Sequence, residues 1–147
     1  MKQRGVVKHR ARFAQQVEHD GWCDVLPRNI TPSDIDVVFD NMLRSRTLFC
    51  EFSSAVSLWS GKENGQRYLY QQLLKTNNYQ NGCVLCHHNI PVGKNVNSLR
   101  DVVSFQVMRA DKGVVYFMPS ESKSFQGTLW IEFVKSFYGL ENTWGKW

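Results

Sequence analysis

Two short segments of the chain alternate hydrophobic and polar residues in the way that β-strands do. They are residues 34–40 (DIDVVFD) and residues 47–53 (TLFCEFS), and the polar stretch between them can form a turn. Successive side chains of a strand point to opposite faces, so each segment has one apolar face and one face that includes acids. The apolar positions are Ile35, Val37, Phe39, Leu48, Cys50 and Phe52, and the opposite positions are Asp34, Asp36, Val38, Asp40, Phe49, Glu51 and Ser53. The short connection predicts an antiparallel pair.

Three other segments space their apolar residues as helices do. The first helix is expected over residues 6–19. The second begins near Ser60, because Ser60 and Glu63 match a capping box. The third covers residues 124–139, with Gly139 as its C-terminal cap. The expected buried stripes are Leu69, Leu73 and Tyr70 in the second helix and Phe125, Leu129, Phe133 and Phe137 in the third.

Two further stretches predict strands. Residues 82–91 (GCVLCHHNIP) read as a short strand that ends in polar residues, and residues 101–119 read as a hairpin around the turn 111–113. The order of elements is therefore helix, two strands, helix, strand, hairpin and helix. This order predicts a mixed α/β fold in which helices flank a central mixed sheet, and the length of the chain favours one domain over residues 1–147.

The charge of the chain bears on its partners. The formal net charge is +5 and the isoelectric point is about 9.1, which permits a polyanionic partner without requiring one. Five cations precede the first acid: Lys2, Arg4, Lys8, Arg10 and Arg12. Two interpretations stay open for this segment, an arm or helix that contacts the DNA backbone and an ordinary solvated helix face.

Cysteine usage and hydropathy bear on the compartment. The four cysteines stand at positions 23, 50, 83 and 86, and Cys50 falls in an apolar strand, where a free thiol behaves as a small hydrophobe. We therefore expect a reducing, cytoplasmic setting. The chain has no run of about 18 apolar residues, and residues 1–13 lack the apolar core of a secretory signal, so we expect no membrane partner.

Asp36 and Glu51 are the residues for which the pattern predicts chemistry. Both acids should point to the same face of the antiparallel pair, where two carboxylates make an oxygen-rich site that suits Mg²⁺ or Mn²⁺. A bound ion of this kind can activate water and stabilise charge on a phosphate. Asp34 shares that face and could bind the ion or orient its neighbour. The alternative is a strand with exposed acids, which is common in proteins.

The segments PSDIDVVFD, LFCEFS and GQRYLY, in this order, resemble the PD-(D/E)XK nuclease superfamily, in particular its small phage-type and RecB-like members. The resemblance covers roughly residues 8–90. It matches the first motif to Asp36, the acid of the second motif to Glu51, and a Gln-x-x-x-Tyr helix motif to Gln66 and Tyr70. It implies a restriction-endonuclease-like fold and Mg²⁺- or Mn²⁺-dependent hydrolysis of DNA. It also implies a phage-encoded protein in a bacterial host and allows a homodimer.

The lysine of that superfamily has no counterpart at its usual place, because Ser53 stands two residues after Glu51. A hydroxyl offers no positive charge to a phosphate. Three explanations stay open. The role has moved to Lys62, which lies four residues before Gln66 and so on the same side of a helix; the lysine was removed by mutation; or the domain binds nucleic acid without cleaving it.

The resemblance also implies supporting residues outside the two strands. Glu18, in the helix before the first motif, is a further candidate metal ligand. The candidate nucleic-acid contacts are Tyr70 of the helix motif and, independently of the resemblance, Arg10 and Arg12 of the basic N-terminal segment and His88 at a strand end. The run from Cys83 to His88 could suggest zinc, but alternation along a strand would separate its side chains. Three competing classes remain: a binding module with a degenerate nuclease fold, a different metal enzyme on a mixed α/β scaffold, and a zinc-binding regulatory protein.

Overall fold

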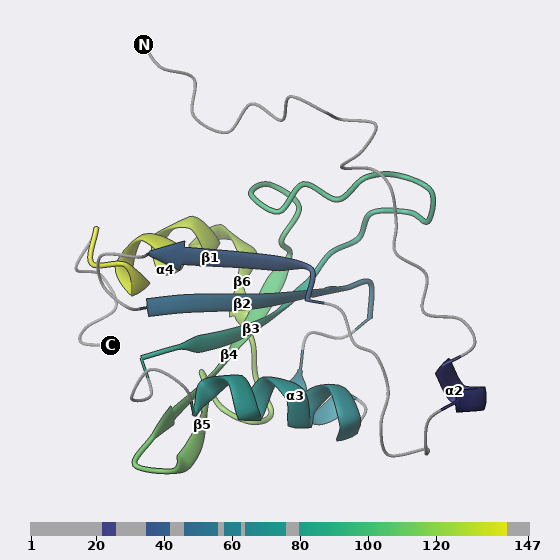
Figure 1. Ribbon diagram of the computed structural model, residues 1–147. Coiled ribbons are helices and arrows are strands. Elements are labelled where there is room, and N and C mark those ends of the chain that lie inside the picture. The colour runs from purple at the N-terminus through teal and green to yellow at the C-terminus, as the bar shows by residue number, and fades with distance from the viewer. Residues whose placement is uncertain are drawn as a thin grey trace. The chain divides into compact units, whose positions relative to one another are not determined.

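The computed structural model describes six stretches of the chain: residues 22–25, 35–41, 46–55, 58–62, 64–75 and 80–140. By its internal contacts the chain divides into two compact units, Met1–Asp34 and Ile35–Trp147. In the first unit the structure describes one short helix, α2 (Trp22–Val25). The helix expected over residues 6–19 lies outside the described residues. All the other described elements belong to the second unit (Figure 1).

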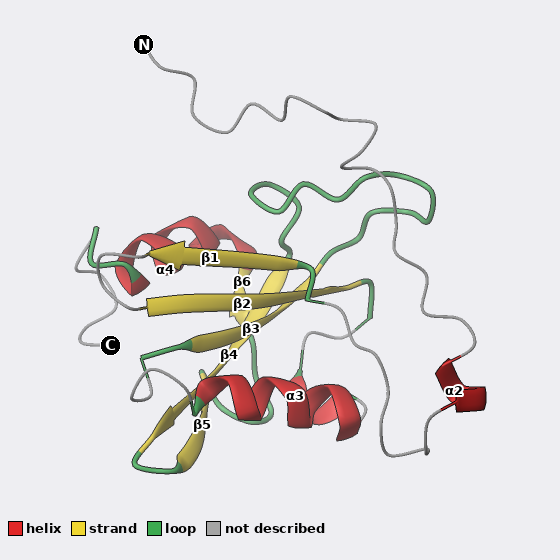
Figure 2. Ribbon diagram, in the orientation of Figure 1, coloured by secondary structure: helices red, strands yellow, loops and turns green. Residues whose placement is uncertain are grey.

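The second unit is a mixed sheet in the order β1-β2-β3-β4-β5, with a sixth short strand, β6, paired with β4. The strands are β1 (Val37–Asn41), β2 (Arg46–Ser53), β3 (Gly82–His87), β4 (Ser104–Asp111), β5 (Val114–Met118) and β6 (Phe125–Gln126). The β2–β3 pair is parallel and the other pairs are antiparallel. Helix α3 (Asn64–Leu74) lies on one face and α4 (Trp130–Phe137) on the other (Figure 2). The predicted mixed α/β class is confirmed.

The β1–β2 hairpin has the predicted antiparallel pairing, with Val37 opposite Cys50. Leu48, Cys50 and the partly buried Phe52 pack in the cluster on the α4 face, whereas Phe49 packs in the cluster on the α3 face. The alternation expected of residues 47–53 is therefore confirmed. Ile35 differs from the prediction: it packs on the α3 face, because it precedes the first residue of β1 and is outside the strand alternation.

Helix α3 begins later than the capping box predicted. Residues Trp59–Gly61 form a short 3-10 helix, and Lys62 then has extended backbone angles, so Ser60 does not cap α3. The buried stripe is also shifted by one residue. Tyr70 and Leu74 are fully buried and Leu73 is half-buried, while Leu69 is outside the core cluster. The helix is therefore rotated so that Tyr70 faces the sheet.

The β4–β5 hairpin confirms the predicted turn. Asp111 pairs with Val114, which leaves a two-residue loop of Lys112 and Gly113 with φ of 49° and 81°. Positive φ at both loop positions is the geometry that twists tight hairpins correctly, and glycine adopts it without strain. Residues 104–118 complete the sheet: β4 lies between β3 and β5, and five of the six residues of β3, all but His87, are buried.

The expectation of one helix over residues 124–139 is wrong in its first third. Phe125 and Gln126 form β6, which pairs with the start of β4, and a 3-10 turn leads into α4. The reason is a tertiary contact: the backbone N–H of Gly127 donates to the carbonyl of Val103 at 2.7 Å, which holds this segment against the sheet. The C-terminal cap is confirmed, because Gly139 has φ of 71° and its N–H donates to Ser136 O.

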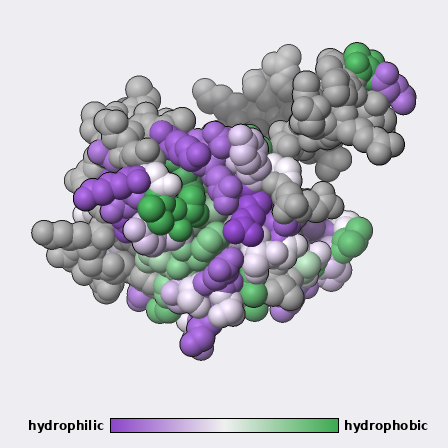
Figure 3. Space-filling view, turned by 90° about the horizontal axis from the view of Figure 1, so that it is seen from below, coloured by the Kyte–Doolittle hydropathy of each residue, from purple (hydrophilic) through white to green (hydrophobic). Residues whose placement is uncertain are grey.

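Aromatic rings fill the α4 face of the sheet. Phe105 lies at the centre, with ring centroids of Phe125, Trp130 and Phe133 at 5.3–5.4 Å. The α3 face is more mixed, and its outer surface shows hydrophilic residues beside apolar ones (Figure 3). Within the described residues, no helix has the length and apolar character needed to cross a membrane.

Candidate functional site

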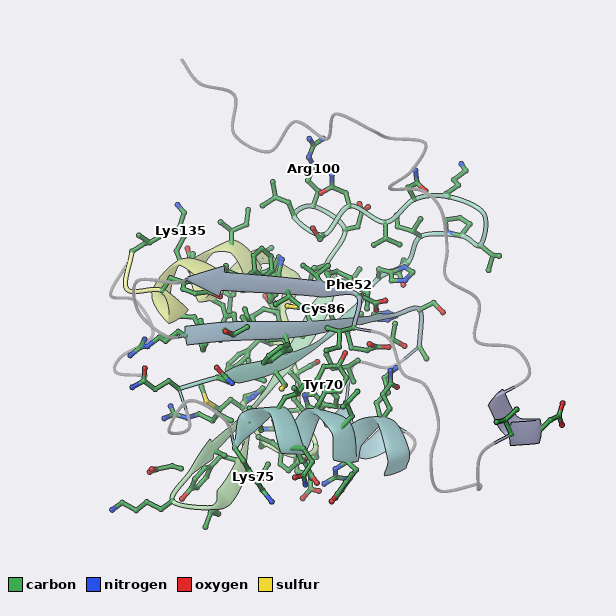
Figure 4. All side chains as sticks on the ribbon, in the orientation of Figure 1. Phe52, Tyr70, Lys75, Cys86, Arg100 and Lys135 are labelled. Carbon is green, nitrogen blue, oxygen red and sulfur yellow. The ribbon has the colours of Figure 1, made fainter. Side chains whose placement is uncertain are left out.

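Glu51 is the centre of a polar cluster between β2 and α3. Gln66 Nε2 donates to Glu51 Oε1 at 2.6 Å, and the Tyr70 hydroxyl donates to Glu51 Oε2 at 2.7 Å. Gln66 and Tyr70 are four residues apart on α3, so they lie on the same side of the helix and reach the same carboxylate. Figure 4 shows Tyr70 between α3 and the sheet. The structure therefore brings together the residues of two separate motifs.

Asp36 lies beside Glu51, at the start of β1. Its Oδ2 accepts a hydrogen bond from the backbone N–H of Phe52 at 2.7 Å, which ties the residue before β1 to the end of β2. Asp36 Oδ1 forms no hydrogen bond with the described residues. Asp36 is exposed, whereas the side chain of Glu51 is 12% exposed. The pair thus offers one solvent-facing and one shielded carboxylate.

Lys62 reaches the same carboxylate from the segment before α3. Its Nζ lies 4.0 Å from Glu51 Oε1, and its side chain is 18% exposed. This distance is at the limit of an ion pair, and a partly shielded ammonium keeps more of its field than an exposed one. The Ser53 hydroxyl, by contrast, accepts a hydrogen bond from the N–H of Ala55 at 3.2 Å. Ser53 therefore shapes the chain after β2, while Lys62 is the cation nearest to Glu51 in the part of the chain described.

The environment of Glu51 raises the pKa of its carboxyl. Burial raises the pKa of the Glu51 carboxyl, and the charge of Asp36 raises it further, against the lowering effects of the Tyr70 and Gln66 hydrogen bonds and of Lys62. Burial and the bond to Glu51 raise the pKa of the Tyr70 hydroxyl, so it stays a donor at neutral pH. A cation placed between the two carboxylates would relieve the repulsion that the structure contains.

The donor set fits a hard divalent cation of the Mg²⁺ type. Such ions are commonly held by one or two carboxylates, with water and phosphate oxygens completing the shell. Each Glu51 oxygen accepts hydrogen bonds from side chains but has a second lone pair, and Asp36 Oδ1 is open. Among the described residues, no three His, Cys, Asp or Glu side chains group closely enough to hold a metal ion by themselves. The two acids would therefore need oxygen ligands from substrate or solvent.

A pocket of about 330 Å³ lies beside Asp36, and two of its lining residues, Val37 and Phe52, pack with the cluster on the α4 face. It is lined by Asp36, Val37, Phe52, His88, Val96 and Ser98. His88 Nδ1 accepts a hydrogen bond from the N–H of Ile90 at 3.1 Å, which leaves the proton of a neutral ring on Nε2. His88 is therefore a hydrogen-bond donor at this pocket. The neighbouring His87 places Nδ1 3.3 Å from the carbonyl of Ser53.

Four of the residues predicted for the site lie outside the described residues: Asp34, Glu18, Arg10 and Arg12. For them the predictions stay predictions. The zinc arrangement is not assembled: Cys83 packs in the cluster on the α3 face and Cys86 in the cluster on the α4 face, as alternation along β3 requires. Sequence reasoning missed two residues beside the site, Trp59 and Gln106. A glutamine among the apolar residues of β4 was the available signal for the second.

Comparison of this chain with protein-family models, curated proteins and solved structures gives no match. The functional assignment therefore depends on the residues of the cluster and on their geometry.

Proposed function

We propose that this chain is a metal-dependent DNA nuclease of the PD-(D/E)XK type, with its cluster at Glu51 as the active site. The observation that carries the proposal is the convergence of Asp36, Glu51, Gln66, Tyr70 and Lys62, which come from four segments: the start of the β1 strand region, β2, the segment before α3, and α3. A sheet that only presented exposed acids to solvent would not need two side chains of α3 and a lysine from the segment before it around one carboxylate.

Each residue of the cluster then has a role that follows from its contacts. Asp36 and Glu51 would hold Mg²⁺ or Mn²⁺, which would supply an activated water and charge neutralisation at the phosphate. Gln66 and Tyr70 orient Glu51 by donating to both of its oxygens. Lys62 places its ammonium beside the same site, where it can offset charge that develops on the phosphate. Lys62 thus supplies the positive charge that the Ser53 hydroxyl lacks.

The pocket beside Asp36 supplies a place for the nucleic-acid backbone. The Nε2–H of His88 can donate to a phosphate oxygen there, since Nδ1 is already engaged by Ile90. The loop of residues 88–103 that borders the pocket includes two exposed cations, Lys94 and Arg100, and Arg100 lies at the outer edge of this loop in Figure 4. We also propose an intracellular setting, consistent with three buried free thiols, Cys50, Cys83 and Cys86.

The runner-up is a domain that binds nucleic acid or a protein and does not cleave. The observation that favours it is the shielding of Glu51: one side-chain donor on each oxygen and a nearby lysine already surround this carboxylate. The two proposals differ in one measurable property, turnover in the presence of a divalent cation.

The test uses purified protein with labelled linear duplex, single-stranded and branched DNA, in Mg²⁺, in Mn²⁺ and in EDTA. Asp36→Asn removes one candidate ligand, and Asp111→Asn is the matched control, because Asp111 is an exposed acid at the far end of β4. We expect metal-dependent cleavage by the native chain and by Asp111→Asn, and none by Asp36→Asn.

Other outcomes separate the alternatives. Cleavage that persists in EDTA or in Asp36→Asn would show that this cluster is not the active site. DNA binding without cleavage would favour the runner-up, and Ser53→Lys would then be assayed. Cleavage created by that single change would show that the fold is a nuclease disabled at position 53.

A further inference from the structure

Gln106 is a fully buried polar residue in the middle of β4, on the α3 face of the sheet. Its Oε1 accepts a hydrogen bond from the backbone N–H of Trp59 at 2.7 Å. Its Nε2 donates to the carbonyl oxygens of Ser120, Glu121 and Lys123. One side chain thereby ties the segment before α3 to the segment after β5.

Trp59 is the residue that Gln106 holds. It is fully buried, and its ring lies 4.9 Å, centroid to centroid, from the ring of Tyr70. Its indole N–H is buried without a hydrogen-bond partner among the described residues, an arrangement that costs free energy. Its position is therefore not set by its own polar group. The backbone bond to Gln106 and the contact with Tyr70 set it.

The register of the sheet explains how Gln106 acts at a distance. Glu51 on β2 pairs with Leu85 on β3, and Leu85 pairs with Gln106 on β4, so the three residues form one row. Two strand spacings separate Glu51 and Gln106, or about 10 Å. The segment from Trp59 to Lys62 spans this row: its start is fixed at Gln106 and its end lies at Glu51. The Lys62 N–H donates to Trp59 O and closes the turn.

We propose that Gln106 is a positioning residue for the site, which acts through Trp59 to place Lys62 and the Tyr70 hydroxyl at Glu51. The inference rests on the proposed function for its catalytic consequence, but the positioning itself is a property of the fold. No motif includes Gln106 or Trp59, and among the described residues neither forms a hydrogen bond or an ion pair with Glu51. Gln106 and Trp59 would determine the fraction of time that the Lys62 ammonium and the Tyr70 hydroxyl lie at Glu51.

The activity test is a double-mutant cycle at saturating Mg²⁺. Gln106→Met removes the acceptor and the donors and keeps the length of the side chain. We expect kcat to fall at least about tenfold in Gln106→Met and on the order of a hundredfold in Lys62→Ala. The double variant should lose less than the product of the two single losses, because residues that act through one another are not additive. Additive losses would overturn the proposal.

One control separates positioning from simple destabilisation. Val107→Ala truncates a fully buried neighbour on the opposite face, and it should lower stability without lowering kcat at a temperature where the protein is folded. A Val107→Ala loss equal to that of Gln106→Met would mean that Gln106 acts through stability alone.

Amide hydrogen exchange tests the positioning even if the chain does not cleave DNA. In the native chain we expect the backbone N–H of Trp59 to exchange as slowly as the backbone N–H groups of β3. In Gln106→Met the amides of Trp59 and Lys62 should exchange at least about tenfold faster, while those of α4 stay unchanged. Rapid exchange of the Trp59 amide in the native chain would overturn the proposal, and this result does not require the variant to fold.

Discussion

The two faces of the sheet are built from different chemistry, although the same strands supply both. The α4 face is aromatic: Phe105, Phe133 and Phe137 are buried there with few polar atoms among them. The α3 face also has an apolar cluster, but it includes Tyr70 and borders Glu51 and Gln106. Burying a carboxylate and an amide costs free energy unless each is hydrogen-bonded.

The difference indicates that the α4 face mainly stabilises the fold, whereas the α3 face holds the candidate site. On the α4 face a helix with a wide apolar stripe covers the sheet, and burial of rings supplies the stabilising free energy. On the α3 face three polar side chains surround one acid, and the charge of Asp36 opposes that of Glu51. An arrangement that raises the pKa of a carboxyl and shields it is typical of functional sites. Four predictions test this division.

The largest expected effects come from one truncation on each face. Phe133→Ala should lower the free energy of unfolding by about 3–5 kcal/mol, because it opens a cavity among aromatic rings. Glu51→Gln should abolish metal-dependent cleavage and lower stability little. Urea denaturation measures the free energy of unfolding of the two variants, and DNA cleavage is assayed at a temperature where both are folded. Loss of cleavage in folded Phe133→Ala would break the division between the faces.

The next effect concerns the cation at the site. Lys62→Ala should lower kcat on the order of a hundredfold through loss of charge at the phosphate. Lys75→Ala is the matched control, because Lys75 follows α3 at its other end and is exposed (Figure 4). Stability should change little in either variant. Equal activities of the two variants would remove Lys62 from the site and reopen the question posed by Ser53.

A matched pair of tyrosines compares the faces at the level of one hydroxyl. Tyr70 donates to the Glu51 carboxylate on the α3 face, and Tyr138 donates to the carbonyl of Phe39 on the α4 face. Each Tyr→Phe change should cost about 0.5–3 kcal/mol of stability, with the larger loss where the acceptor is charged. Tyr70→Phe should also raise the Mg²⁺ concentration needed for half-maximal cleavage, and Tyr138→Phe should not. A Mg²⁺ requirement that moves equally in both would mean that Tyr70 has no special role.

The smallest effect is a dependence of stability on pH. The raised pKa of Glu51 means that the folded chain binds this proton more tightly than the unfolded chain. Between the ordinary and the raised pKa, the free energy of unfolding therefore falls as pH rises. The charged and titratable groups that face Glu51 are Asp36, Lys62 and Tyr70. Urea denaturation across mildly acidic pH should show this decline in the native chain and in Glu121→Gln, an exposed control, but less of it in Glu51→Gln.

Local patterns in the sequence determined the parts of the fold that depend on neighbouring residues. The alternation over residues 47–53 placed Glu51 and Phe49 on the face opposite Leu48. The short link to β1 led to the prediction that Asp36 would lie beside Glu51. Spacing by four put Gln66 and Tyr70 on one side of a helix. The turn at Lys112 and Gly113 likewise followed from residues adjacent in the chain.

Tertiary structure alone decided which distant segments meet. Phe125 joins a strand instead of a helix because β4 offers its backbone a partner. The bond from Gln106 to Trp59 links residues 47 positions apart and brings Lys62 to Glu51. Helical and strand periodicities report which face a residue takes within its own element. They contain no information on the pairing of β3 with β4 or on the segment that crosses them, because those contacts depend on the free energy of the whole packed domain.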